Sequence, residues 1–194
     1  MKKLWVGIGI VVGVALTIIL IGIPHTVKTW RDKGLALSEL ALYEEALKYY
    51  DKALKIYPRD AKAWTGKGWA LSRLALYEEA LKCYDKAIKI YPRDAKAWRD
   101  KGVALLRLAL YEEALKCYDK AIEIDPLNAR AWSNKGWALS MLGRDEEALK
   151  CFDKAIEIDP LNDLAWAGKG WALEELGRYE EARQAKEKAK RLSE

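Results

Sequence analysis

The sequence is poor in the residues that most enzymes use for catalysis. It has a single histidine, His25, which argues against His-dependent catalysis and histidine-rich metal sites. It has no glycine-rich phosphate loop, no nucleophile elbow, no metal-ligand spacing and no N-x-[ST] glycosylation site. We therefore predict a protein without enzymatic activity, metal or cofactor.

A one-signed charged surface is also missing. The chain has 34 basic and 29 acidic residues, a net charge of +5. Lys2, Lys3 and Lys28 precede the first acidic residue, Asp32, and the rest of the chain carries a net +2 with both signs interleaved. Because nucleic-acid binding needs a basic stripe, we predict no nucleic-acid partner.

Cysteine is limited to Cys83, Cys117 and Cys151, which are spaced by 34 residues. An odd number of cysteines at equivalent positions is not a disulfide framework. Stacked helices lie about 8–10 Å apart, too far for a bridge without movement. We expect small buried thiols, which favour the reducing side of a membrane.

One long apolar run extends from Leu4 to Ile23, with 20 uncharged residues. A helix of this length spans about 30 Å, the thickness of a bilayer core. We predict a transmembrane helix over 4–23 within an N-terminal segment 1–26, which would contact the lipid bilayer and make a single-pass membrane protein. A cleaved signal peptide is the alternative, but no A-x-A-like site follows the run.

The same run carries signals for helix packing and orientation. Gly9, Gly13 and Thr17 follow the small-xxx-small spacing that lets two transmembrane helices approach closely. Basic residues flank both ends of the run, so the side of the remaining chain is unresolved. The short MKK start favours an extracytoplasmic side.

The rest of the chain repeats with a period of 34 residues. The recurring residues are Trp30, Trp64, Trp98, Trp132 and Trp166, Gly34, Gly68, Gly102, Gly136 and Gly170, and Pro58, Pro92, Pro126 and Pro160. The periodicity predicts five units of two helices each, over 27–60, 61–94, 95–128, 129–162 and 163–194. Asp60, Asp94, Asn128 and Asn162 are the predicted N-caps of the first helices, and proline ends the second helices.

One unit shows the pattern most clearly, through Trp64, Gly68, Tyr77, Ala80, Tyr84, Ala87 and Pro92. This pattern resembles the tetratricopeptide repeat, over about residues 27–194. The resemblance implies an all-α fold, a right-handed superhelical solenoid of five helix-turn-helix repeats with a concave groove, here preceded by the predicted transmembrane helix. Similar proteins usually bind peptides or other proteins and have no catalytic activity of their own.

The chain departs from this family's pattern at the turn inside each unit. The last two units have the usual glycine, Gly143 and Gly177, but the first three have Ala41, Ala75 and Ala109. A non-glycine residue in a left-handed cap costs about 1 kcal/mol, so we expect a different turn or longer helices there. The polar last segment, which contains Lys186 in place of an aromatic residue, suits the end of a solenoid in water.

Helical geometry places two rows of side chains opposite the packed face of the first helices, the face that lines the groove in similar proteins. One row is Leu35, Trp69, Val103, Trp137 and Trp171. The other row is Lys28, Lys62, Lys96 and Arg130, reinforced by Arg99. The family's carboxylate-clamp subtype has asparagine in the first row, and its absence here argues against that binding mode.

These rows predict a membrane-anchored scaffold whose groove binds a protein or peptide partner with apolar anchors and acidic flanks. Two other roles for the tryptophans are the filling of gaps between repeats and the stacking of sugars. The alternative function is a structural subunit that self-assembles into an oligomer or filament through repeat faces, solenoid ends or the transmembrane helix. The paired glutamates that begin each second helix are explained by the helix dipole, without catalysis.

Overall fold

The computed structural model describes residues 26–194, and this part of the chain contains helices and turns but no strand. The first helix covers residues 26–39. The other helices are α2 (Tyr43–Ile56), α3 (Ala61–Arg73), α4 (Tyr77–Ile90), α5 (Ala95–Arg107), α6 (Tyr111–Ile124), α7 (Ala129–Met141), α8 (Asp145–Ile158), α9 (Asp163–Glu175) and α10 (Tyr179–Ser193). The predicted all-α fold is confirmed.

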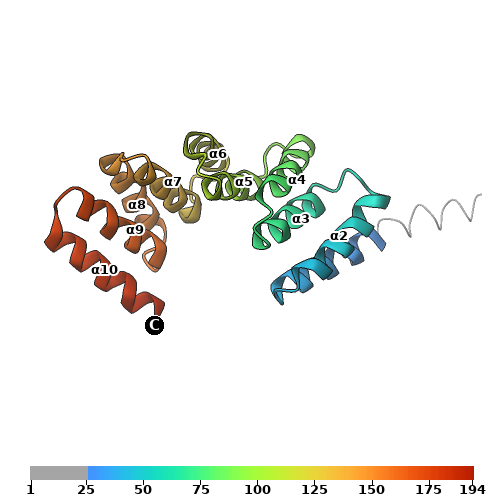
Figure 1. Ribbon diagram of the computed structural model, residues 1–194, viewed down its shortest axis with the longest axis horizontal. Helices are drawn as coiled ribbons and strands as arrows, with labels where there is room; N and C mark the ends of the chain where they lie inside the picture. Colours follow the sequence, from blue (N-terminus) through green and yellow to red (C-terminus); the bar gives the residue numbers. More distant parts are fainter. Residues whose placement is uncertain (1–25) are drawn as a thin grey trace, which may run out of the picture.

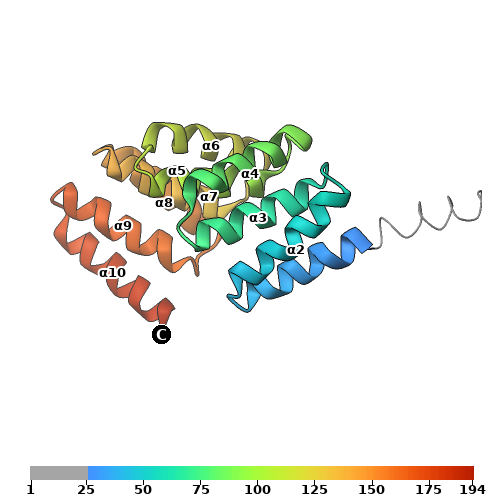
Figure 2. The same ribbon diagram turned by 45° about the vertical axis from the view of Figure 1, so that its right-hand side comes forward.

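The helices form pairs, and each pair packs against the next one in sequence order. In Figure 1 the pairs follow one another along an arch, from the blue helix to the red α10. Figure 2 shows the same arrangement from a second direction, with α2 and α10 at opposite ends of the described chain. This stacking of helix pairs is a solenoid.

Asparagine and aspartate caps begin the first helices of the last four pairs, α3, α5, α7 and α9, as predicted. The Asp60 side chain accepts a hydrogen bond from the Ala63 backbone N–H, 3.1 Å away, and Asn162 caps α9 in the same way through Ala165. Proline follows the second helix of each of the first four units and stops it, because proline has no N–H to donate to the preceding turn.

A column of aromatic rings fills the interior of the helix pairs. Its members are Tyr50, Tyr84, Tyr118 and Phe152, each at most 1% exposed. The rings pack directly against glycines of the first helices, since a Cβ added at Gly102 would lie 2.6 Å from Cε1 of Tyr118. The repeating glycines are therefore required for the close approach of helix and ring.

Two further contacts recur at the junctions between units. The indole N–H of Trp98 donates to the carbonyl oxygen of Pro92 at 2.9 Å, and Trp64, Trp132 and Trp166 do the same at their own prolines. Lys101 forms an ion pair with Asp85 of the preceding unit at 2.6 Å, which is also repeated along the chain. Each junction is thus held by the same pair of polar contacts.

The turn inside each unit is the same in all five, which corrects our expectation for the three alanine units. Ala41, Ala75 and Ala109 have φ between 58° and 61°, in the left-handed region, and Gly143 and Gly177 have φ of 69° and 72°. In each turn the residue after this position donates its N–H back to a carbonyl five residues earlier, at 2.8–3.0 Å. These hydrogen bonds form a Schellman motif, which fixes the alanines in a conformation that alanine disfavours.

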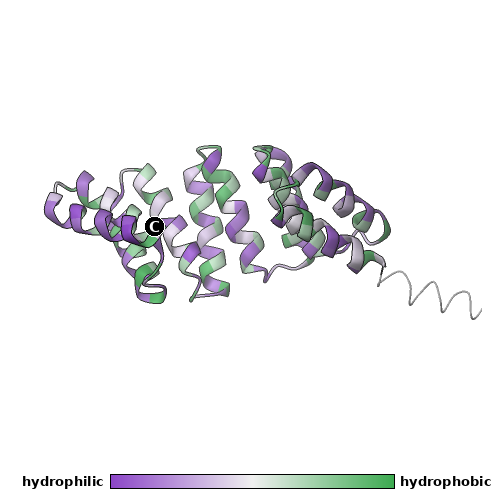
Figure 3. Ribbon diagram, turned by 90° about the horizontal axis from the view of Figure 1, so that it is seen from below, coloured by the Kyte–Doolittle hydropathy of each residue, from purple (hydrophilic) through white to green (hydrophobic). Residues whose placement is uncertain are grey.

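The last helix, α10, is strongly hydrophilic, and its ribbon near the C-terminus is mostly purple in Figure 3. Lys186, which takes the place of the aromatic ring, forms an ion pair with Glu174 on α9. The predicted polar end of the solenoid is confirmed.

The predicted transmembrane helix over 4–23, with its packing residues Gly9, Gly13 and Thr17, lies outside the described residues. Among residues 26–194, no helix combines the length and the apolar character needed to cross a membrane. This finding, which concerns the described residues, overturns the predicted single-pass membrane localisation and the extracytoplasmic placement that went with it.

Candidate partner-binding groove

A cavity of about 610 Å³ opens on the first helices of the central units. It is lined by Trp69, Ser72, Arg73, Tyr77, Tyr84, Arg99, Asp100, Val103, Arg107, Arg130, Ser133, Asn134, Asn162 and Leu164, and we call it the central groove. The central groove brings together Trp69, Val103, Arg99 and Arg130 of the two predicted rows. Both rows therefore contribute to one surface.

A second cavity of about 380 Å³ lies near the N-terminal end of the solenoid and brings together Leu35, Lys62 and Lys96. Leu35 is 47% exposed, and both lysines are exposed. Arg31, which also lines this cavity, donates to Asp60 at 3.0 Å, so its charge is already paired.

The remaining predicted residues line neither cavity. Trp137 packs edge-on against Phe152, with ring centroids 5.7 Å apart, and lies 6.4 Å from Trp171. Trp137 thus fills a gap between helices, whereas Trp171 is 44% exposed. Lys28 is exposed at the start of the first helix.

Three functional candidates in the central groove lie outside the predicted rows. Arg73 and Arg107 end helices α3 and α5, and Tyr77 begins α4. The Arg73 guanidinium donates to the Tyr43 hydroxyl at 3.1 Å and lies 6.0 Å from the Trp69 ring centroid. The spacing of Arg73 and Arg107, one repeat apart, is the sequence signal that identifies them.

Asp100 is the one acidic residue that lines the central groove. It is 7% exposed, and its Oδ1 accepts hydrogen bonds from Arg99 Nε at 3.0 Å and Nη2 at 2.7 Å. Burial raises the pKa of the Asp100 carboxyl, and the neighbouring Arg99 partly offsets this rise. The Arg99 charge is therefore paired with Asp100. This leaves Arg73, Arg107 and Arg130 as the cations of the central groove that are available to a ligand.

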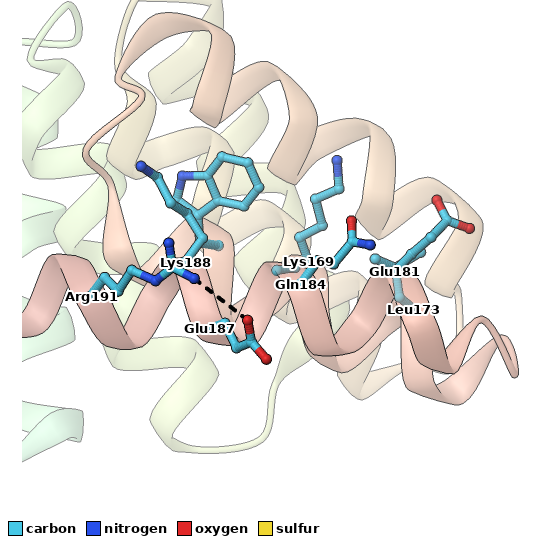
Figure 4. A pocket seen from close by; sticks show the side chains of 9 residues that line it. Lys169, Leu173, Glu181, Gln184, Glu187, Lys188 and Arg191 are labelled. Atoms are coloured by element: carbon cyan, nitrogen blue, oxygen red, sulfur yellow. Dashed lines mark ion pairs between the residues drawn. The ribbon is translucent and has the colours of Figure 1, made fainter.

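A third cavity, of about 380 Å³, lies between α9 and α10 and is shown in Figure 4. Ala185 lines it at the position that holds cysteine in the three preceding units, so a smaller side chain leaves space there. Its charged residues include Arg191, whose Nη2 forms an ion pair with Oε2 of Glu187 at 3.6 Å. The charges in this cavity are already partly paired, and the cavity contains none of the predicted groove residues.

The cysteines are buried free thiols, as predicted. Burial raises the pKa of Cys117 and of Cys151 to about 11, and it also raises the pKa of Cys83. The reactive thiolate is therefore scarce at neutral pH.

We expect iodoacetamide to alkylate Cys117 and Cys151 at least about 100-fold more slowly than an unfolded cysteine at about pH 8, because the neutral thiol persists up to the raised pKa. Mass spectrometry of the full chain with and without urea measures this difference. Equal labelling rates in the folded and unfolded protein would contradict the burial of the thiols.

Models of the tetratricopeptide repeat match residues 25–93, 68–129, 129–162 and 151–184. Together these matches cover residues 25–184, which reaches from the first helix into α10. The chain belongs to the tetratricopeptide repeat (TPR) family. No curated protein matches this TPR chain in sequence.

Solved structures of other proteins share its fold. MamA from Desulfovibrio magneticus RS-1 is 24% identical and has a TM-score of 0.76, over 87% of this chain and 95% of that one. PilF of Pseudomonas aeruginosa is 22% identical, with a TM-score of 0.80 over 88% and 78% of the two chains. YrrB, described as a TPR protein with an unusual peptide-binding site, is 26% identical, with a TM-score of 0.67 over 84% of each chain.

Proposed function

We propose that this TPR protein is a non-catalytic scaffold whose central groove binds a segment of a partner protein with apolar residues and acidic flanks. The observation that carries the proposal is the composition of the groove. Trp69, Val103 and Leu164 offer apolar contacts, and Arg107 and Arg130 offer positive charge beside them. Leu164 is 57% exposed, so this contact is open to a ligand.

The charge of the groove supports an acidic ligand. The guanidinium groups of Arg107 and Arg130 form no hydrogen bond or ion pair with another residue of the described chain. Guanidinium groups present two parallel N–H donors that match a carboxylate. An acidic side chain of a bound segment would supply the partner that these arginines lack.

The aromatic residues support an apolar anchor next to that charge. Trp69 packs edge-on against Tyr43 at 5.6 Å, which holds one wall of the groove in place before a ligand arrives. A fixed wall reduces the entropy lost on binding, and tryptophan is frequent in binding hot spots. The peptide-binding site described for YrrB adds support from a similar TPR chain.

Selection from a random peptide library on the full chain tests the proposal. We expect the selected peptides to combine acidic residues with leucine or an aromatic residue, and Arg107→Glu with Arg130→Glu to weaken their binding at least about tenfold. Lys120→Glu with Lys154→Glu, which changes the same amount of charge on the second helices, is the matched control. Selected peptides without acidic residues, or equal losses in both double variants, would overturn the assignment.

A further inference from the structure

The turns that join the two helices of each unit have two different chemistries. In the last two units the left-handed glycine is followed by arginine, at Arg144 and Arg178. In the first three units the left-handed alanine is followed by leucine, at Leu42, Leu76 and Leu110. These leucines are 42–45% exposed. Three units thus have a partly exposed apolar side chain where two units have a cation.

The difference between leucine and arginine at this position also decides whether the glutamate three residues further on has an ion-pair partner. Arg144 donates to both carboxylate oxygens of Glu147 at 2.8 Å, and Arg178 pairs with Glu181 in the same way. The equivalent residues of the first three units are the exposed Glu45, Glu79 and Glu113. None of these three forms an ion pair within residues 26–194.

The leucines and glutamates share one edge of the solenoid. Each turn joins two antiparallel helices, and adjacent helix pairs are stacked in contact, so the turns follow one another along the arch of Figure 1. The side chains Leu42, Leu76, Leu110, Glu45, Glu79 and Glu113 therefore form a stripe over three consecutive units, which we call the turn edge. The charged members of the turn edge are all glutamates, although Arg73 and Arg107 end the helices that lead into its second and third turns and line the central groove.

We propose that the turn edge is a docking surface for an amphipathic, basic segment of a partner protein. Leucine side chains of the segment would cover the exposed leucines, and its lysine or arginine side chains would take the position that Arg144 and Arg178 occupy beside their own glutamates. Charge complementarity selects this occupant. A second copy of the chain would bring glutamates against glutamates in a two-fold contact, which like-charge repulsion disfavours.

The repeats of the chain provide the matched variant. A triple variant carries Leu42→Arg, Leu76→Arg and Leu110→Arg. It gives the first three units the arginine that the last two units already have at this position. We expect this triple variant to fold, since Arg144 and Arg178 show that arginine is accommodated at the start of the second helix with a glutamate partner. A loss of binding in this variant is therefore separable from a loss of folding, which circular dichroism checks.

The probe is a fluorescein-labelled amphipathic peptide with leucine on one helix face and lysine on the other, measured by fluorescence anisotropy on the full chain. We expect the triple variant to bind it at least about tenfold more weakly than the wild type. Arg144→Leu with Arg178→Leu extends the turn edge and is expected to tighten binding. The same peptide with serine in place of leucine controls for charge alone and should also bind at least about tenfold more weakly.

Three outcomes would overturn the proposal. The first is equal binding of the probe to the wild type and to the triple variant. The second is equal binding of the leucine and serine peptides, since it would reduce the effect to non-specific attraction. The third is a wild-type oligomer in sedimentation that the triple variant abolishes, which would make a second copy the occupant. The groove variants Arg107→Glu and Arg130→Glu should leave probe binding unweakened, so this test is independent of the proposed groove function.

Discussion

Substitution of Phe152 by alanine is expected to destabilise the protein by about 3–5 kcal/mol, the range for removal of a buried phenylalanine. The ring is 0% exposed and lies between the first helices of two successive units. A Cβ on Gly136 or on Gly168 would lie 2.7 Å or 2.3 Å from Cε1 of Phe152. Because these glycines present bare backbone to the ring, they have no side chains that could move in to fill the cavity.

Urea denaturation of the full chain, followed by circular dichroism, measures this effect. Tyr179→Ala is the control, since Tyr179 is 70% exposed and its loss should change the free energy of unfolding by less than about 0.5 kcal/mol. Gly168→Ala should destabilise by about 1–3 kcal/mol through overpacking, and Phe152→Leu should relieve part of that cost in the double variant. A loss below about 1 kcal/mol in Phe152→Ala would show that the ring is not a principal contact between the units.

Replacement of Ala41, Ala75 and Ala109 by glycine is expected to stabilise the protein by about 1 kcal/mol per site, or about 3 kcal/mol in the triple variant. Each alanine is held at a positive φ, where its Cβ crowds the backbone and where glycine is unstrained. The gain is smaller than the full strain because glycine has more freedom to lose on folding. This result would be unusual, since glycine normally destabilises a protein when it replaces alanine.

The last two turns supply the reverse experiment. A Cβ at Gly143 or Gly177 would meet no other atom within 4 Å, so alanine there changes only the backbone preference. Gly143→Ala and Gly177→Ala should each destabilise by about 1 kcal/mol. Ala36→Gly, at an exposed position inside the first helix, should also destabilise, by about 0.5–1 kcal/mol. Urea midpoints that fall in the triple glycine variant would contradict the assigned strain.

The solenoid was predictable because its main determinants are local and repeated. Each cap, such as Asp60, and each proline acts on the helix next to it in sequence, and a period of 34 residues shows which pattern is structural. The alanine turns were not predictable in this way. The intrinsic preference of alanine opposes the left-handed conformation, and the hydrogen bonds of the turn and the packing of the two helices outweigh that preference.

The groove was predictable only where helical geometry decides the position of a side chain. Helical projection identified Trp69, Val103 and Arg130, because all three lie on the first helices. It gave no indication that Asp100 would be buried and paired with Arg99, since burial depends on the packing of neighbouring helices. The packing of the partly buried Trp137 likewise depends on the position of Phe152 on a neighbouring helix.

The repeated junction contacts have a consequence for the evolution of the chain. Every junction joins a tryptophan to the preceding proline and a lysine to the preceding aspartate. Loss of residues 61–94 from the gene would bring Trp98 next to Pro58, and Lys101 within reach of Asp51, with both contacts available again. Gene duplication or deletion can therefore change the length of the arch by one unit at a time, because the new junction contains the same two contacts as the others.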